Sequence, residues 1–176
     1  MAATWRAVTI LPTYAATAKS LLKVFNATGS GVVLRVYRVW LLNSQIAAVA
    51  GVLAPVSLVR ISTVGSGGIA VTPVKHDTSS TALPAQVTAA YGDTTPGTVD
   101  ATFRRVQVST DEQLVGTLTS NQLEGFHPIN RLWDSGYGDS NVEPIVLREG
   151  FGISVYTPGV ASAAGIADVI IEFTVI

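Results

Sequence analysis

Gly-, Pro- and Asn-rich stretches divide the chain into short apolar runs, several of which alternate apolar and polar residues. A period of two is typical of β-strands, because successive side chains of a strand point to opposite faces. The clearest run is 166–175. Its apolar residues would line one face of a strand: Ala167, Val169, Ile171, Phe173 and Val175. The sequence contains no heptad repeat that would favour a coiled coil, and it predicts an all-β protein.

The residue types agree with this pattern, because Val, Ile and Thr suit pleated, half-buried surfaces and the chain has 24, 11 and 19 of them in 176 residues. About eight strands are expected from the runs and the turn residues between them. They cover 21–25, 32–42, 55–62, 69–74, 102–109, 145–147, 151–156 and 166–175. Short antiparallel strands of this number favour a two-sheet sandwich, jelly-roll-like in its winding.

The length is that of one domain. Residues 1–19 are rich in Ala and Thr and are interrupted by Pro12. We expect them to form an extended N-terminal arm, and residues 20–176 to form a single β-sandwich domain.

Two hairpins are expected. The runs 21–25 and 32–42 flank the loop 26–31, whose Asn and Gly residues permit a tight reversal. The runs 144–147 and 151–156 flank the turn 148–150. Each pair is predicted to form an antiparallel ladder across its turn.

The strand 32–42 is apolar on both faces, and 48% of the chain is hydrophobic while 13% is charged. If one face is in the core, the other needs a cover. We take Val33, Tyr37, Val39 and Leu41 as candidates for an interface with another subunit or with a larger assembly, with a long loop over the outer face as the alternative. The expected assembly is a homo-oligomer.

Several function classes are disfavoured by composition. The net charge is −1 and the Lys and Arg residues are scattered, so no basic stripe would neutralise nucleic-acid phosphates. Residues 39–59 carry no charge over the length of a membrane span, but three polar residues at 43–45 together with Gly51 and Pro55 favour a strand, a loop and a strand. The chain has no Cys, which fits folding in a reducing cytoplasm.

The sequence offers few candidates for catalytic residues. His76 and His127 are the two histidines, and neither lies within a triad signature, so loop or subunit-contact roles are expected for both. Scattered carboxylates leave a carbohydrate-active enzyme as a third possibility. We expect no catalytic residue, no cofactor and no enzyme activity.

The segment 133–141 combines aromatic and oxygen-bearing side chains with glycines. Calcium would use such oxygens, but a turn needs the same Asp, Asn and Gly residues and no EF-hand spacing is present. Trp133 and Tyr137 could stack on a sugar. We therefore take Trp133, Asp134, Tyr137 and Asp139 as loop contact candidates, and expect no metal.

Several segments, 23–31, 35–40, 72–77, 133–139 and 144–155, together resemble small virion structural proteins of tailed bacteriophages. The resemblance spans 19–176. It implies a capsid decoration or cement protein, an antiparallel β module, often trimeric, that clamps adjoining major capsid protein subunits on the head lattice. It carries over no functional residue.

The sequence therefore leads to one expectation and a runner-up. The expectation is a non-enzymatic virion structural protein of the capsid exterior, assembled in the host cytoplasm, that trimerises and binds major capsid protein through its arm and sheet edges. The runner-up is a receptor- or carbohydrate-binding head domain of a phage tail or head fibre.

Overall fold

A computed structural model of the chain describes residues 3–10, 12–14, 17–43, 53–109, 129–136, 142–159 and 165–176. These residues form twelve strands and no helix. The strands are β1 (Ala3–Thr9), β2 (Lys19–Asn26), β3 (Leu34–Asn43), β4 (Leu53–Ile61), β5 (Ile69–Val71), β6 (Val74–Lys75), β7 (Val87–Tyr91), β8 (Val99–Ser109), β9 (Ile129–Asp134), β10 (Ile145–Leu147), β11 (Phe151–Thr157) and β12 (Ala167–Val175). The predicted all-β class is confirmed.

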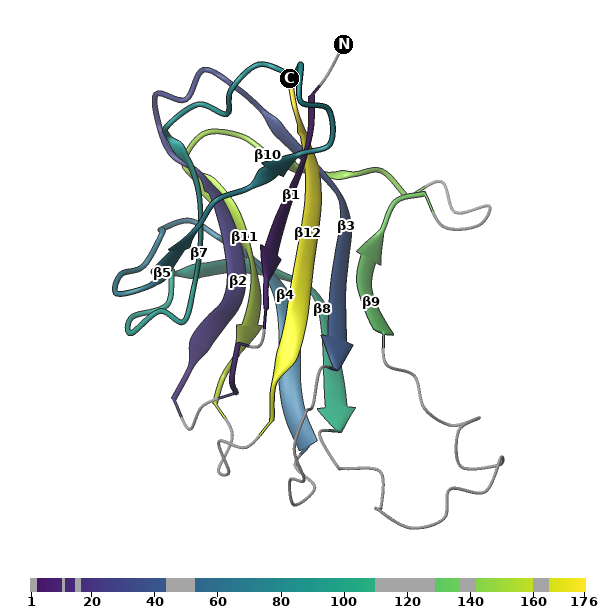
Figure 1. The fold of residues 1–176 in the computed structure, drawn as a ribbon. Coiled ribbons are helices and arrows are strands. Elements are labelled where there is room, and N and C mark those ends of the chain that lie inside the picture. The colour runs from purple at the N-terminus through teal and green to yellow at the C-terminus, as the bar shows by residue number, and fades with distance from the viewer. Residues whose placement is uncertain are drawn as a thin grey trace, which may run out of the picture.

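The strands form two antiparallel sheets that pack face to face (Figure 1). The first sheet has the order β10-β3-β12-β1-β6, and β9 also pairs with β3. The second sheet has the order β5-β7-β2-β11-β4-β8. The predicted two-sheet sandwich is therefore confirmed.

The strand pairs are nested. The first four strands each pair with a strand from the second half of the chain, in reverse order. The pairs are β1 with β12, β2 with β11, β3 with β10, and β4 with β8. The pairs also alternate between sheets, since β1 and β3 belong to the first and β2 and β4 to the second. The chain thus behaves as one long antiparallel ribbon rolled into two layers.

The two predicted hairpins are wrong for this reason. β2 and β3 lie in opposite sheets, and so do β10 and β11. The short turns are corners between the layers, and turn residues mark a change of direction without fixing whether the flanking strands pair. Both corners lie side by side, because Glu149 of one accepts backbone hydrogen bonds from Gly29 and Gly31 of the other, at 3.1 and 2.7 Å.

The predicted N-terminal arm is also wrong. β1 lies inside the first sheet, paired with β12 on one side and β6 on the other. Its Trp5 and Ala7 side chains are buried in the core, and Tyr14 beyond it is buried as well. Alternation of Trp5 and Ala7 with polar Thr4 and Arg6 is a strand signal that the abundance of Ala and Thr obscures.

The core fills the space between the two sheets and draws side chains from both. The face predicted for the last strand is confirmed at four positions that are fully buried: Ala167, Val169, Ile171 and Phe173. Packing of these alternating residues against the second sheet explains the period of two in the sequence.

β3 contains a β-bulge at Tyr37. Val36 pairs with Phe173, and Arg38 pairs with Glu172, so Tyr37 has no partner in β12. A bulge inserts one residue and thereby reverses the alternation of side chains beyond it.

The bulge corrects the prediction of an apolar outer face. Leu34 faces the core before the bulge, and Val39 and Leu41 face the core after it, all fully buried. The four interface candidates therefore do not share a face, and Val39 and Leu41 are unavailable to a partner. Val33 and Tyr37 are half-buried.

The second sheet is partly covered on its outer side by the loops around residues 64–68 and 92–95. Under this cover, Lys23 Nζ lies 2.7 Å from Asp93 Oδ1, and both side chains are almost fully buried. The Lys23 ammonium also donates to the backbone oxygen of Val64. A buried ion pair thus ties β2 to the two covering loops.

The segment weighed as a membrane span contains the end of β3 and the start of β4. Across the described ranges, the chain has no helix that is long and apolar enough to cross a membrane.

Candidate functional site

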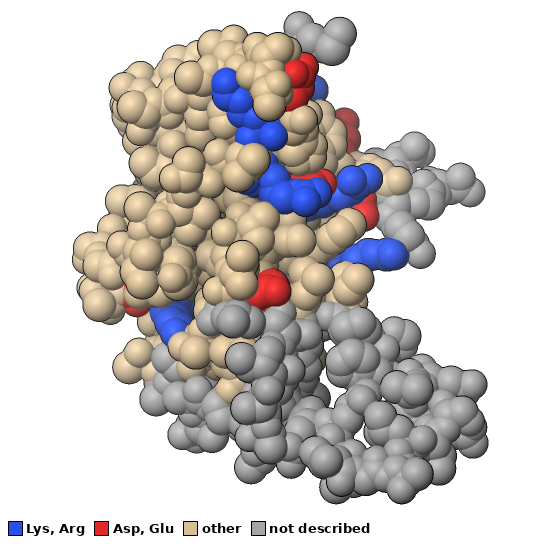
Figure 2. All heavy atoms as spheres, viewed as in Figure 1, with Lys and Arg blue, Asp and Glu red and all other residues tan. Residues whose placement is uncertain are grey.

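Charged side chains form a row across the outer face of the first sheet. Arg6 of β1 is in register with Glu172 of β12, Glu172 with Arg38 of β3, and Arg38 with Asp134 of β9. Figure 2 shows a band of mixed blue and red atoms on the face toward the viewer, where Figure 1 places the first sheet. The signs alternate along the row, so the charged row is internally neutral.

Glu172 is the centre of the charged row. Arg6 Nε donates to its Oε1 at 2.9 Å, and Arg38 Nη1 donates to its Oε2 at 3.3 Å. Arg38 Nε also lies 3.6 Å from Asp134 Oδ1. The Glu172 side chain is only 8% exposed, while the side chains of both arginines are nearly half exposed. The carboxylate is therefore held from two sides beneath the arginines.

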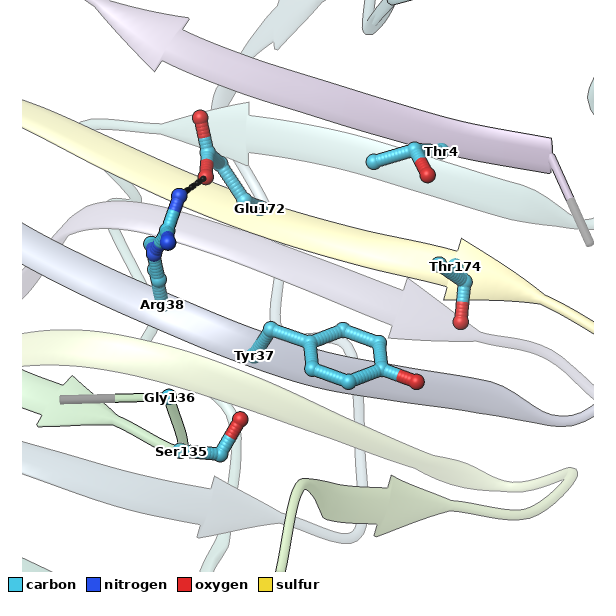
Figure 3. Close-up of a pocket in the computed structure, with 7 residues that line it drawn as sticks. All are labelled: Thr4, Tyr37, Arg38, Ser135, Gly136, Glu172 and Thr174. Carbon is cyan, nitrogen blue, oxygen red and sulfur yellow. Dashed lines mark hydrogen bonds and ion pairs between the residues drawn. The ribbon is translucent and has the colours of Figure 1, made fainter. Parts of the chain in front are cut away.

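A pocket of about 270 Å³ lined by polar residue types lies beside this row. It is lined by Thr4, Tyr37, Arg38, Ser135, Gly136, Glu172 and Thr174. Figure 3 shows that these residues come from β1, β3, β12 and the turn after β9, and that the Tyr37 ring lies along its strand. Four segments far apart in the sequence therefore build one site.

The bulge and the following turn fix one wall of the pocket. Ser135 donates its backbone N–H to the carbonyl oxygen of the bulged residue Tyr37 at 2.9 Å. Asp134 Oδ1 accepts from the backbone N–H of Gly136 at 3.1 Å. These bonds attach the turn to β3, so the pocket has a rigid rim.

Thr174 stands out among the pocket residues. It is 9% exposed, and its hydroxyl oxygen is buried without a hydrogen-bond partner in the protein. Buried hydroxyls are normally satisfied, by protein groups or by bound molecules. This atom can therefore bond to whatever enters the pocket.

Of the four predicted loop contact candidates, the structure places one in this site. Asp134 belongs to the charged row. Trp133 lies in β9 rather than in a loop, half-buried, and its ring is 5.8 Å from that of Phe103 between the two sheets. Its packing against the core argues against a sugar-stacking role. Tyr137 and Asp139 lie outside the described residues.

His76 lies near the same row, with Nε2 3.8 Å from Glu172 Oε1, and His127 lies outside the described residues. Within the described ranges, no group of three or more His, Cys, Asp or Glu side chains could hold a metal ion. The calcium alternative for 134–141 falls largely on residues that the structure does not describe.

Sequence reasoning missed Glu172, Thr174, Thr4 and Ser135 as site residues. Glu172 was recognisable as a charge in the middle of an apolar strand, and Arg6 and Arg38 as opposite charges in other strands. What the sequence lacks is the register that sets them side by side.

A second feature is the lateral side of the sandwich at β5 and β6, which we call the open side. An apolar groove of about 390 Å³ lies there. Its lining includes Trp5, Val71, Leu83, Pro84 and Val87. The groove lies beside one edge strand of each sheet, β6 of the first and β5 of the second.

Exposed apolar side chains gather on edge strands. Among the described residues, nine large apolar side chains are exposed, and five of these lie on edge strands of the two sheets. The five are Ile69 on β5, Val74 on β6, Val99 on β8, Ile129 on β9 and Val146 on β10. The largest exposures among them, 65% for Val74 and 58% for Ile69, flank the open side.

No family model, curated protein or solved structure matches this chain.

Proposed function

We propose that the chain is a non-enzymatic virion structural protein, a capsid decoration or cement protein that forms a homotrimer and binds major capsid protein. Its place would be the capsid exterior, after assembly in the host cytoplasm. The observation that carries the proposal is the gathering of exposed apolar side chains on the edge strands, above all on the open side.

Edge strands present unpaired N–H and C=O groups, and proteins that stay monomeric usually protect them with charges, bulges or covering segments. Here Ile69 and Val74 are large, apolar and more than half exposed on two such strands. Their chain neighbours Ala70 and Pro73 line an apolar groove whose lining also includes Leu83 and Pro84. Such a surface gains free energy when another protein covers it.

The winding supports the same class. We take the nested pairing of the first four strands with the later strands as that of a jelly roll, a more specific fold than a two-sheet sandwich. Jelly rolls occur widely in viral capsid and lectin domains. This support is an analogy between folds and does not itself identify a partner.

The charge distribution also fits a protein partner. The row around Glu172 is satisfied within the chain, and the net charge is −1. Nucleic-acid binding relies on cations that remain available to phosphates. The proposed role therefore uses apolar contact at the edges in place of a basic face.

Co-sedimentation with isolated phage heads that lack their decoration protein tests the proposal. The wild-type chain should sediment with the heads, and the double variant Ile69→Lys with Val74→Lys should stay in the supernatant. Both positions are so exposed that lysine should leave the fold intact. Ile10→Lys is the matched control, because Ile10 is an exposed apolar residue that follows β1, an inner strand of the first sheet.

Sedimentation of the wild type and Ile10→Lys with loss in the double variant would support the proposal. Equal sedimentation of all three proteins would remove the open side from it, and no sedimentation of the wild type would contradict the capsid role.

The runner-up function is a receptor- or carbohydrate-binding head of a phage fibre. The pocket beside Glu172 is the observation that favours it, since Tyr37 and three hydroxyl side chains line that pocket. A glycan array with the wild-type chain separates the two functions when combined with the sedimentation experiment.

A further inference from the structure

We infer that the pocket on the outer face of the first sheet is a binding site for a single neutral sugar ring, a pyranose. The inference goes beyond the proposed function, because it uses the outer face of the first sheet, while the proposed contacts with other proteins use the edge strands and the open side. Either can therefore fail without the other.

The pairing of the charged side chains in and beside the pocket indicates a neutral ligand. The pocket contains Arg38 and Glu172, which are already paired with each other at 3.3 Å. Arg6 and Asp134 complete the neighbouring pairs. A site with one unpaired charge would attract an ion of opposite sign, whereas this site offers fixed donors and acceptors with no net charge.

The polar groups match a molecule that carries several hydroxyls. Thr4, Ser135 and Thr174 each bring a hydroxyl that both donates and accepts. Thr174 Oγ1 is buried and lacks a partner in the protein, so a ligand hydroxyl would satisfy it. A sugar ring presents donors and acceptors around its rim in the same way.

Tyr37 supplies the apolar surface. Its ring is part of the pocket wall and lies along β3 (Figure 3). Aromatic rings pack well against the C–H face of a sugar while polar groups bind its edge. The half-buried Tyr37 side chain is presented here because it is the extra residue of the bulge.

Size limits the ligand to one ring. The pocket measures about 270 Å³, just below the range of roughly 300 to 1,000 Å³ typical of sites for drug-sized molecules. The backbone bond from Ser135 to Tyr37 holds its rim in place, so little ordering is needed on binding.

Saturation-transfer difference NMR tests the inference with free glucose, galactose, mannose and N-acetylglucosamine as neutral probes and N-acetylneuraminic acid as an anionic probe. At least one neutral sugar should receive saturation on its ring protons. In ¹⁵N-labelled wild-type protein, the same sugar should shift the amide signals of Ser135 and Gly136. This second readout needs no variant and keeps the test independent of folding defects.

Two variants locate the site. Tyr37→Leu should weaken binding about fivefold or more, in line with the usual strength of an aromatic contact. Thr174→Val removes the buried hydroxyl at nearly constant shape and should weaken binding to a similar extent. Tyr91→Leu and Thr102→Val are the matched controls, since both residues lie in the second sheet.

Loss in the two pocket variants, with binding retained in both controls, would support the site. Saturation of none of the neutral sugars would overturn it. So would binding of only the anionic sugar N-acetylneuraminic acid, or binding that leaves the Ser135 and Gly136 signals unmoved.

Discussion

Arg38 and Glu172 face each other across β3 and β12 because Tyr37 is an extra residue in β3. The inserted residue lets Val36 and Val39 both point into the core while Arg38 points outward. One bulge thus fills the core and places a cation beside the buried carboxylate of Glu172. The charged row, the pocket and the apparent two-faced hydrophobicity of β3 share this origin.

Deleting Tyr37 should be tolerated by the fold. Without it, Leu34, Val36, Val39 and Leu41 would alternate regularly on the core side of an ordinary strand. We expect the free energy of unfolding in urea to fall by less than about 2 kcal/mol, the cost of local contacts at the bulge.

Deleting Trp40 is the matched control. It keeps the bulge but moves the side chains after position 40 of β3 to the opposite face of the sheet. This variant should fail to fold cooperatively. Equal damage from both deletions would show that the bulge does not explain the pattern of β3.

Glu172→Gln should destabilise the protein. The change leaves Arg6 and Arg38 without their shared buried partner, at an expected cost of about 1 to 2 kcal/mol in the free energy of unfolding. Asp100→Asn breaks the more exposed pair of Arg60 and Asp100, joined at 2.5 Å, and should cost less than about 1 kcal/mol. A larger loss in Asp100→Asn would contradict the central position given to Glu172.

Glu149 should make stability depend on acid pH. Backbone hydrogen bonds from Gly29 and Gly31 lower the pKa of this carboxyl below its ordinary value of 4.5. Its contribution to stability is therefore present above the ordinary pKa and is lost as the pH falls through the lower pKa of the folded state.

Urea unfolding between pH 7 and pH 3 measures this contribution. Glu149→Gln should be less stable than the wild type at pH 7, and the difference should shrink as the pH falls. Glu143→Gln, a change at an exposed glutamate near β10, is the control. A difference between wild type and Glu149→Gln that stays constant with pH would refute the role of the charge.

The buried pair of Lys23 and Asp93 should be strongly coupled. Asp93→Leu alone leaves the Lys23 ammonium buried without its partner, and the free energy of unfolding should fall by about 3 to 5 kcal/mol. Adding Lys23→Met should recover much of that loss, because no buried charge then remains. Additive losses in the double variant, measured by urea unfolding, would contradict the coupling.

The sequence predicts strands well where one face is buried without interruption. Ala167 to Phe173 is such a case, because each apolar residue meets the opposite sheet. It misleads at β3, where the bulge at Tyr37 turns Val39 and Leu41 toward the core although regular alternation would place them on the same face as Tyr37. It also merges β5 and β6 into one strand, 69–74, and misses β7 and β9, whose residues do not alternate regularly between apolar and polar.

Pairing and the candidate site are less predictable for the same physical reason. The turn 148–150 looks like a hairpin but is a corner, since local residues do not specify which distant strand completes the ladder. The pocket requires Thr4, Tyr37, Ser135 and Thr174 to meet across four segments. Only the register of those segments brings them together.

The proposed function requires the apolar open side to join this chain to other proteins, first of all to copies of itself. Light scattering coupled to size-exclusion chromatography measures this association. We expect a mass of three times 18.4 kDa for the wild type, and 18.4 kDa for the variant that carries Ile69→Lys and Val74→Lys. A wild-type mass of 18.4 kDa at every concentration would contradict it.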